Sequence, residues 1–181
     1  MLTVGKEKAD SSRMNNMIFI KGYAEELPFL NENFDIVFSR LGFHHFADTK
    51  TVFSEMVRVL RPGGKLVLID MEAADEELRN TEDEIETLRD PSHVRNLSMS
   101  EMLNLFAMHN LTVEKCEKTE MKQNLKSWLA LTKTTEKIQA EITKRMKNDM
   151  RNKEKTGFSP YLEDDEICFN QKWILMIGCK K

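Results

Sequence analysis

The feature that most constrains this chain is a pair of short apolar runs on either side of a helical segment. Residues 36–38 and 66–69 lack polar alternation, which is typical of strands buried on both faces of a parallel sheet. Between them, Asp48 can cap a helix with one broad apolar side, and Pro-Gly-Gly at 62–64 can end it. The order strand, helix, strand predicts a βαβ unit with a right-handed crossover.

Composition narrows the class of protein. A chain of 181 residues with 40 % hydrophobic and 31 % charged residues fits one ordinary globular domain. Its net charge of −3 gives no electrostatic reason to expect nucleic acid as a partner, and no apolar segment is long enough to predict a membrane span. Cys116, Cys168 and Cys179 form no CxxC pair, so we expect small buried residues in a reducing cytoplasm.

Local patterns predict the remaining elements in chain order. The acidic segment 72–88 is expected to form a solvated helix that can serve as a lid, and Ser98 with Glu101 fits a capping box. The last strand is apolar on both faces in its second half, so it should lie inside the sheet. The expected strands are 17–20, 34–40, 65–71, 111–120 and 167–179, and the other expected helices are 1–9, 99–109, 124–131 and 135–150.

The alternation of strands and helices predicts an α/β layered sheet. Ligands of such sheets bind beyond the carboxyl ends of the strands. This rule selects three segments as candidate parts of a site: residues 22–28, 39–46 and 70–73.

Four stretches resemble one enzyme family. Residues 19–29 read FIKGYAEELPF, 34–40 read FDIVFSR, 44–46 read HHF and 57–66 read VRVLRPGGKL. In this order and spacing they resemble the class I S-adenosylmethionine-dependent methyltransferases, in the branch near the ubiquinone and menaquinone C-methyltransferases. The tail, with a polar loop at 89–95 and a final strand that bears Trp173, extends the resemblance to nearly the whole chain.

The resemblance implies an α/β, Rossmann-like, three-layer methyltransferase sheet in a single domain, 1–181. Its parts would be a partial cofactor-binding half (1–71), an acceptor-side lid and helix (72–110), and a strand-helix-helix-strand tail (111–181). The chain has seven glycines, and no two of them form a G-x-G motif. The order of motifs in the family would place the Gly-rich loop before residue 1. We therefore expect an N-terminally truncated domain that lacks the first βαβ unit and is inactive alone.

The resemblance also assigns a cofactor side, for S-adenosyl-L-methionine. The residues at matching positions are Tyr23, Ala24, Glu25, Ser39 and Arg40. Tyr23 stands where the family usually has Asp, so it offers adenine a hydroxyl or a stacking face instead of a carboxylate. Arg40 can face the cofactor carboxylate or the acceptor, or form a surface ion pair.

The adjacent histidines His44 and His45 are the catalytic candidates. Methyl transfer needs a base when the acceptor is a hydroxyl, an enol or an acidic carbon, but either histidine can instead pack or cap the following helix. Phe43, His93 and Arg95 are expected on the substrate side, with a plain connecting loop as the alternative for His93. No metal site is predicted, because adjacent histidines diverge and no further ligand is spaced to join them.

The sequence leaves two functions open. The first is a methyltransferase that acts on a small-molecule acceptor, and the second is a non-catalytic remnant or association module without cofactor binding. Loss of the neighbouring strand would leave the strand at 34–40 with an unpaired edge, and such edges recruit partners. We therefore expect a homodimer that forms through this exposed sheet edge.

Overall fold

A computed structural model describes residues 2–181. The chain forms one mixed sheet with the strand order β1-β2-β5-β3, in which β1 and β2 are parallel and the other pairs are antiparallel. The short strand β4 pairs with β5 as an outer hairpin that the sequence patterns did not predict. The bounds are β1 (Phe34–Arg40), β2 (Leu60–Met71), β3 (Leu111–Asn124), β4 (Tyr161–Glu163) and β5 (Glu166–Lys180).

The predicted βαβ unit is confirmed. Helix α2 (Thr49–Val59) connects β1 to β2, and the Asp48 side chain accepts a 3.0 Å hydrogen bond from the Thr51 amide at its start. The helix ends before the Pro-Gly-Gly sequence, because Leu60 already lies opposite Phe34 in the parallel ladder. The last strand also lies inside the sheet as expected, since β5 pairs with both β2 and β3.

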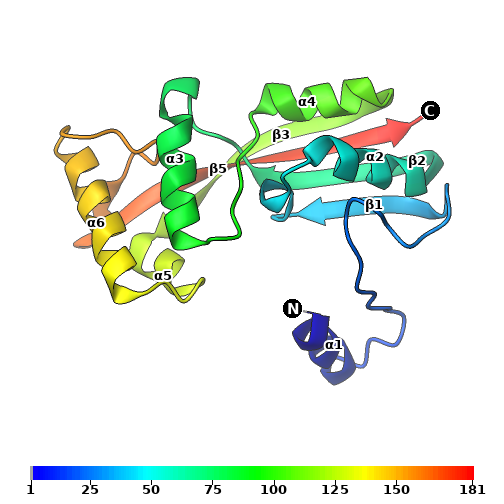
Figure 1. The fold of residues 1–181 in the computed structure, drawn as a ribbon, viewed down its shortest axis with the longest axis horizontal. Coiled ribbons are helices and arrows are strands. Elements are labelled where there is room, and N and C mark those ends of the chain that lie inside the picture. Colours follow the sequence, from blue (N-terminus) through cyan, green and yellow to red (C-terminus); the bar gives the residue numbers. More distant parts are fainter. Residues whose placement is uncertain (1) are drawn as a thin grey trace.

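The main hydrophobic core lies under α2 and α4 (Met99–Met108) on one face of the sheet (Figure 1). Helix α4 begins with the predicted capping box of Ser98 and Glu101, and Asn110 follows its end with a positive φ of 56°. The largest fully buried side chains of this core are Phe43, Phe53, Phe106, Leu60, Leu66, Leu68, Met102 and Ile174.

A second, smaller core fills the other end of the sheet. Here α3 (Glu76–Arg89), α5 (Leu125–Ala130) and α6 (Glu136–Met150) surround the end where β3 finishes and β5 begins (Figure 1). The rings of Trp128, Phe158 and Phe169 pack edge to face, with centroids 5.1–5.6 Å apart. Ile85, from the acidic helix, is fully buried among them.

Two sequence expectations about the elements of the fold are wrong. Residues 17–20 form no strand, and Ile18 is 85 % exposed, because no neighbouring strand accepts this segment. Helix α3 is not a purely solvated helix, because Arg79, Glu82 and Glu86 are buried. Their burial depends on contacts with distant segments, which the density of charge in the sequence does not reveal.

Much of the exposed apolar surface lies in the first 38 residues. Helix α1 (Leu2–Ser11) stands away from the sheet (Figure 1), and β1 carries Ile36 and Phe38 exposed to solvent. Within residues 2–181, β1 pairs only with β2, so its outer edge is open.

No helix among the described residues has the length and apolar character to cross a membrane.

The three cysteines differ in exposure. Cys168 is buried, whereas Cys116 is exposed and Cys179 is partly exposed. The expectation of three buried thiols is therefore wrong for two of them.

Candidate active site

The candidate site lies where β1 and β2 end, as the strand-end rule predicts. The Leu41 amide donates a 2.9 Å hydrogen bond to the Ile69 carbonyl, which extends the pairing of the two strands by one residue. The short 3-10 helix η1 (Phe43–His45) follows at once and turns the chain back over the end of β2. This turn brings His44 onto Asp70, the penultimate residue of β2.

His44 and Asp70 form a buried pair. The His44 Nδ1 lies 2.6 Å from the Asp70 Oδ1, and the two residues are 8 % and 1 % exposed. Asp70 also accepts backbone hydrogen bonds from Phe43 at 2.7 Å, Gly42 at 3.2 Å and Met71 at 2.8 Å. A carboxylate so placed accepts a hydrogen bond from the Nδ1–H group, so the lone pair of the neutral imidazole lies on Nε2, which has no hydrogen-bond partner among residues 2–181.

Hydrogen bonds hold the loop that follows α3 against His44 and His45. The His44 carbonyl accepts hydrogen bonds from the amides of Val94 at 3.0 Å and Arg95 at 3.1 Å. The His45 Nδ1 donates to the Ser92 carbonyl at 2.9 Å. The structure therefore separates the two candidates: His44 is oriented by a carboxylate, whereas His45 is turned to the loop.

His93 lies beside His44, with ring centroids 5.6 Å apart. Its Nε2 contacts the Asp83 Oδ1 at 2.8 Å, and the same oxygen accepts from the Asn96 amide at 3.0 Å. The side chain is buried, and its Nδ1 has no partner among the described residues. His93, in the loop after α3, is therefore packed against that helix through Asp83 instead of lining an open surface.

Two buried acidic side chains of α3 complete the surroundings. Burial raises the pKa of Glu82 to about 7, although the Ala74 amide donates a 2.8 Å hydrogen bond to its carboxylate. Burial also raises the pKa of Glu86, against the opposing effect of Arg89, whose guanidinium lies 3.0 Å from its Oε2. The charge that Glu82 gives the inner face of α3 therefore changes near neutral pH.

The expected cofactor-side loop is braced by α2. Arg58 donates to the carbonyls of Leu27 at 3.0 Å and Phe29 at 2.9 Å, and the Leu27 amide donates to Glu55 at 2.8 Å. The ring of Tyr23 is 80 % exposed at the start of this loop. The loop is therefore held in place while Tyr23 remains open to a ligand.

The remaining cofactor-side residues differ in exposure. Ala24 is partly buried against the main core, Glu25 is exposed and Ser39 is half-buried. The Arg40 guanidinium lies over the ring of Trp173, 5.3 Å from its centroid, in place of the ion pair that the sequence allowed.

Of the residues expected on the substrate side, Phe43 is buried in the main core against Phe53. Arg95 is exposed and pairs with Glu101 of α4. The structure brings His44 and His93 together, whereas it directs Phe43 into the core and Arg95 outwards.

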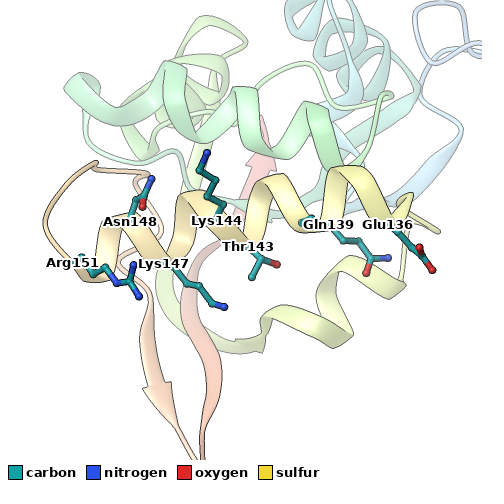
Figure 2. A pocket seen from close by; sticks show the side chains of 8 residues that line it. Glu136, Gln139, Thr143, Lys144, Lys147, Asn148 and Arg151 are labelled. Carbon is teal, nitrogen blue, oxygen red and sulfur yellow. The ribbon is translucent and has the colours of Figure 1, made fainter.

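A hollow of about 590 Å³ lies elsewhere, along α6 (Figure 2). Its lining side chains come from this helix, including Lys144 and Lys147, and from Arg151 directly after it. None of the sequence-predicted residues borders it, so it is not part of the candidate site.

Comparison with known proteins agrees with this geometry. Residues 1–68 match the family described as "Methyltransferase domain". The chain is 36 % identical over 139 residues to the uncharacterized protein YafE of Escherichia coli (strain K12), which covers 76 % of this chain and 67 % of YafE. It belongs to the class I S-adenosylmethionine-dependent methyltransferases.

Two further methyltransferases place the chain within the family. The uncharacterized methyltransferase YcgJ of Bacillus subtilis (strain 168) is 34 % identical over 130 residues, which are 71 % of this chain and 51 % of YcgJ. The solved structure of YcgJ superposes with a TM-score of 0.89 at 29 % identity and covers the whole chain and 78 % of that structure. The demethylmenaquinone methyltransferase of Listeria welshimeri is 44 % identical over 70 residues, 39 % of this chain and 30 % of that enzyme. The sequence matches thus span about half the length of YcgJ and less than a third of the Listeria enzyme.

In this methyltransferase fold, sequence reasoning placed the segment 70–73 at the site but did not identify the carboxylate partners of the histidines. Asp70 follows directly after the apolar run at 66–69, at the end of a buried strand, and that position was the available signal. Asp83 was not identifiable, since it is one of many acidic residues in α3. Among residues 2–181, no three His, Cys, Asp or Glu side chains lie close enough to hold a metal ion.

Proposed function

We propose that this methyltransferase domain acts on a small-molecule acceptor and that His44 is the general base. The observation that carries the proposal is the 2.6 Å contact from His44 Nδ1 to Asp70, which leaves Nε2 free to take a proton. A base is needed for acceptors whose nucleophile is a hydroxyl, an enol or an acidic carbon. The acceptor class is therefore a small molecule that loses a proton when it gains the methyl group.

S-Adenosylmethionine would supply a methyl group that its sulfonium charge already activates. The residues that fit its adenine are Tyr23, whose ring is open, and Ala24, whose backbone amide has no hydrogen-bond partner within residues 2–181. Glu25 follows Ala24 in the same loop, and Ser39 is the penultimate residue of β1. Arg40 would offer a positive charge, positioned by its contact with Trp173.

The protein's own residues then perform two tasks. The braced loop and the strand ends hold the reactants in line, which is the main contribution that a methyltransferase makes. His44 Nε2 takes the acceptor's proton, and the Asp70 carboxylate stabilises the resulting imidazolium. His45, which donates to Ser92, positions the covering loop.

The test is release of S-adenosylhomocysteine by the full chain with a panel of phenolic, enolic and carbon-acid acceptors, and turnover would overturn the expectation from sequence that the domain is inactive alone. We expect His44→Gln to lower kcat by about 10²-fold or more, because a positioned base contributes about 10²–10⁴-fold. His45→Gln is the matched control and should mainly change KM. Equal kcat losses in the two variants would contradict the assignment of His44.

The competing function is an association module that does not bind the cofactor. It is favoured by the absence of G-x-G among the seven glycines of this sequence. Calorimetric titration with S-adenosylhomocysteine distinguishes the two: micromolar binding supports the methyltransferase, and no heat at millimolar ligand supports the association module.

We also propose that two copies associate through β1 in a reducing compartment such as the cytoplasm. The open edge of β1 presents unpaired backbone groups, and Ile36 and Phe38 lie exposed beside it. An antiparallel pair centred on Val37 would set Ile36 of one copy opposite Phe38 of the other, which is self-complementary. Light scattering that shows a monomer at all concentrations would contradict this proposal.

A further inference from the structure

A serine and a histidine meet where the helices α2 and α4 lie side by side on one face of the sheet (Figure 1). The Ser54 Oγ lies 2.8 Å from the His109 Nε2. Ser54 is an exposed residue of α2, and His109 directly follows the last residue of α4 and is partly exposed. Both side chains are therefore within reach of a small molecule from solvent, and neither belongs to the candidate active site.

The surroundings of His109 determine which ring nitrogen carries the proton. The Nδ1 lies 2.9 Å from the Leu105 carbonyl oxygen, and because a carbonyl can only accept, Nδ1 must be the donor. The lone pair of the neutral imidazole then lies on Nε2, so the Ser54 hydroxyl donates its hydrogen to it. The ring also packs against buried Phe53, with centroids 5.2 Å apart. His109 is thus held in the tautomer that can take a proton from Ser54.

These contacts have the form of an activated nucleophile. Such a nucleophile lies within hydrogen-bond reach of a base, and a third group orients the base. A helical Ser or Thr can instead donate to the carbonyl one turn back, as Thr87 does to Asp83 at 2.7 Å. Among residues 2–181, the Ser54 hydroxyl makes no hydrogen bond except the one to His109. Its proton is therefore directed at a base and not at its own helix.

A cavity of about 230 Å³ lies between α2 and α4, one helical turn from this pair. Lys50 and Leu105 line it, and they precede Ser54 and His109 by one turn of their respective helices. Residues one turn apart share a helix face, so the cavity and the pair lie on the same side of the two helices. Lys50 is exposed and brings a positive charge to that side. The cavity has room for a small acyl group or leaving group beside the hydroxyl.

We propose that Ser54 accepts acyl groups from small activated acyl donors, with His109 as its general base. The Ser54 Oγ bonds to the acyl carbon while its proton passes to His109 Nε2, and the Leu105 carbonyl stabilises the imidazolium through the Nδ1–H group. The bond from the acyl carbon to the leaving oxygen breaks, and that oxygen departs with the electron pair as an aryloxide or a phosphate. The imidazolium then returns the proton to water.

This reaction needs neither a methyl donor nor any residue of the candidate active site. An experiment with the full chain and no S-adenosylmethionine therefore tests Ser54 alone. A negative result would leave the proposed methyl transfer untouched, and a failure of methyl transfer would leave the reactivity of Ser54 untouched.

The experiment is incubation of the full chain with 4-nitrophenyl acetate, followed by peptide mass spectrometry over time. Treatment with hydroxylamine removes acetyl groups from serine esters but not from lysine amides, so it separates the two products. Ser127, an exposed serine of α5 with no histidine partner within residues 2–181, is the internal control. We expect Ser54 to be acetylated at least about 10²-fold faster than Ser127, because a positioned base contributes about 10²–10⁴-fold.

Two variants test the named roles. Ser54→Ala should remove the acetyl group that hydroxylamine releases. His109→Gln keeps a side chain that can form hydrogen bonds but cannot take up the proton, so it should slow acetylation of Ser54 by about 10²-fold. Thermal unfolding verifies that each variant folds, and the ratio of Ser54 to Ser127 in the parent protein tests the proposal without any variant.

Either of two results overturns the proposal. The first is acetylation of Ser54 in the parent protein that is no faster than acetylation of Ser127. The second is an unchanged rate at Ser54 in folded His109→Gln, which would show that the imidazole does not act as the base.

Discussion

Asp70 Oδ1 lies 2.6 Å from His44 Nδ1, and the same carboxylate accepts three backbone hydrogen bonds at the strand ends. One side chain thus fixes both the path of η1 and the orientation of the imidazole. Because Asp70 is almost fully buried, these contacts are made in a medium that strengthens them and penalises their loss.

Asp70→Asn should destabilise the fold by about 1–3 kcal/mol, since an amide cannot accept all of these hydrogen bonds at once and leaves a buried donor unpaired. Urea unfolding measures this loss. Part of the loss comes from His44, so the same substitution should cost less in a His44→Phe background. An identical cost in both backgrounds would show that Asp70 acts on the backbone alone.

Glu82→Gln should stabilise the protein at alkaline pH. Burial raises the folded-state pKa of Glu82 from 4.5 to about 7, so the folded state holds this proton more tightly than the unfolded state. The stability that the protonated group contributes is present below pH 4.5 and is lost as the pH rises through about 7. The variant keeps a neutral side chain, and its advantage at pH 8 should be on the order of 2 kcal/mol.

Thermal unfolding at a series of pH values from 5 to 8 checks this prediction. The difference in stability between Glu82→Gln and the parent should grow with pH over that range. Glu77→Gln, an exposed change in the same helix, is the control and should show no such trend. A constant difference at every pH would contradict the raised pKa.

The parts of the fold that sequence predicted depend on neighbours along the chain. Asp48 caps α2, and Ser98 with Glu101 caps α4, because each cap needs only residues within three positions. The segment at 17–20 has the composition of a strand, but a strand forms only against another strand. The expected strand therefore does not form, because no other strand pairs with it. The local sequence pattern does not show whether such a partner exists.

In the candidate site, too, residues with a local sequence signal were predicted, whereas their distant partners were not. His44 was identified by its place after a strand, but the partner that orients it lies 26 residues away. Similarly, Arg40 was expected to bind a ligand or a surface anion, and its contact with Trp173 required knowledge of the sheet order. The catalytic and binding roles of these residues stay predictions until activity is measured.

Gly178→Ala should destabilise the main core. A Cβ at this position would lie 2.6 Å from Cδ1 of Phe106, a fully buried residue of α4. Neither β5 nor the ring can shift without disturbing its neighbours, so we expect a loss of about 1–3 kcal/mol in the free energy of unfolding. Gly42→Ala is the control, because its nearest atom would be Ser39 Oγ at 4.0 Å. Equal urea midpoints for the two variants would contradict this packing.

Arg58→Lys should loosen the cofactor-side loop while it preserves the charge. The guanidinium binds Leu27, Phe29 and Asn31 at once, whereas an ammonium cannot span these positions. Amide exchange of residues 22–31 should therefore speed up about tenfold, the change that loss of a hydrogen bond to a charged group implies. Arg61→Lys, whose side chain pairs with Asp35 at the exposed surface, is the control and should leave exchange of this loop unchanged. Exchange that is equally slow in both variants would show that the loop is held by its own turns and not by α2.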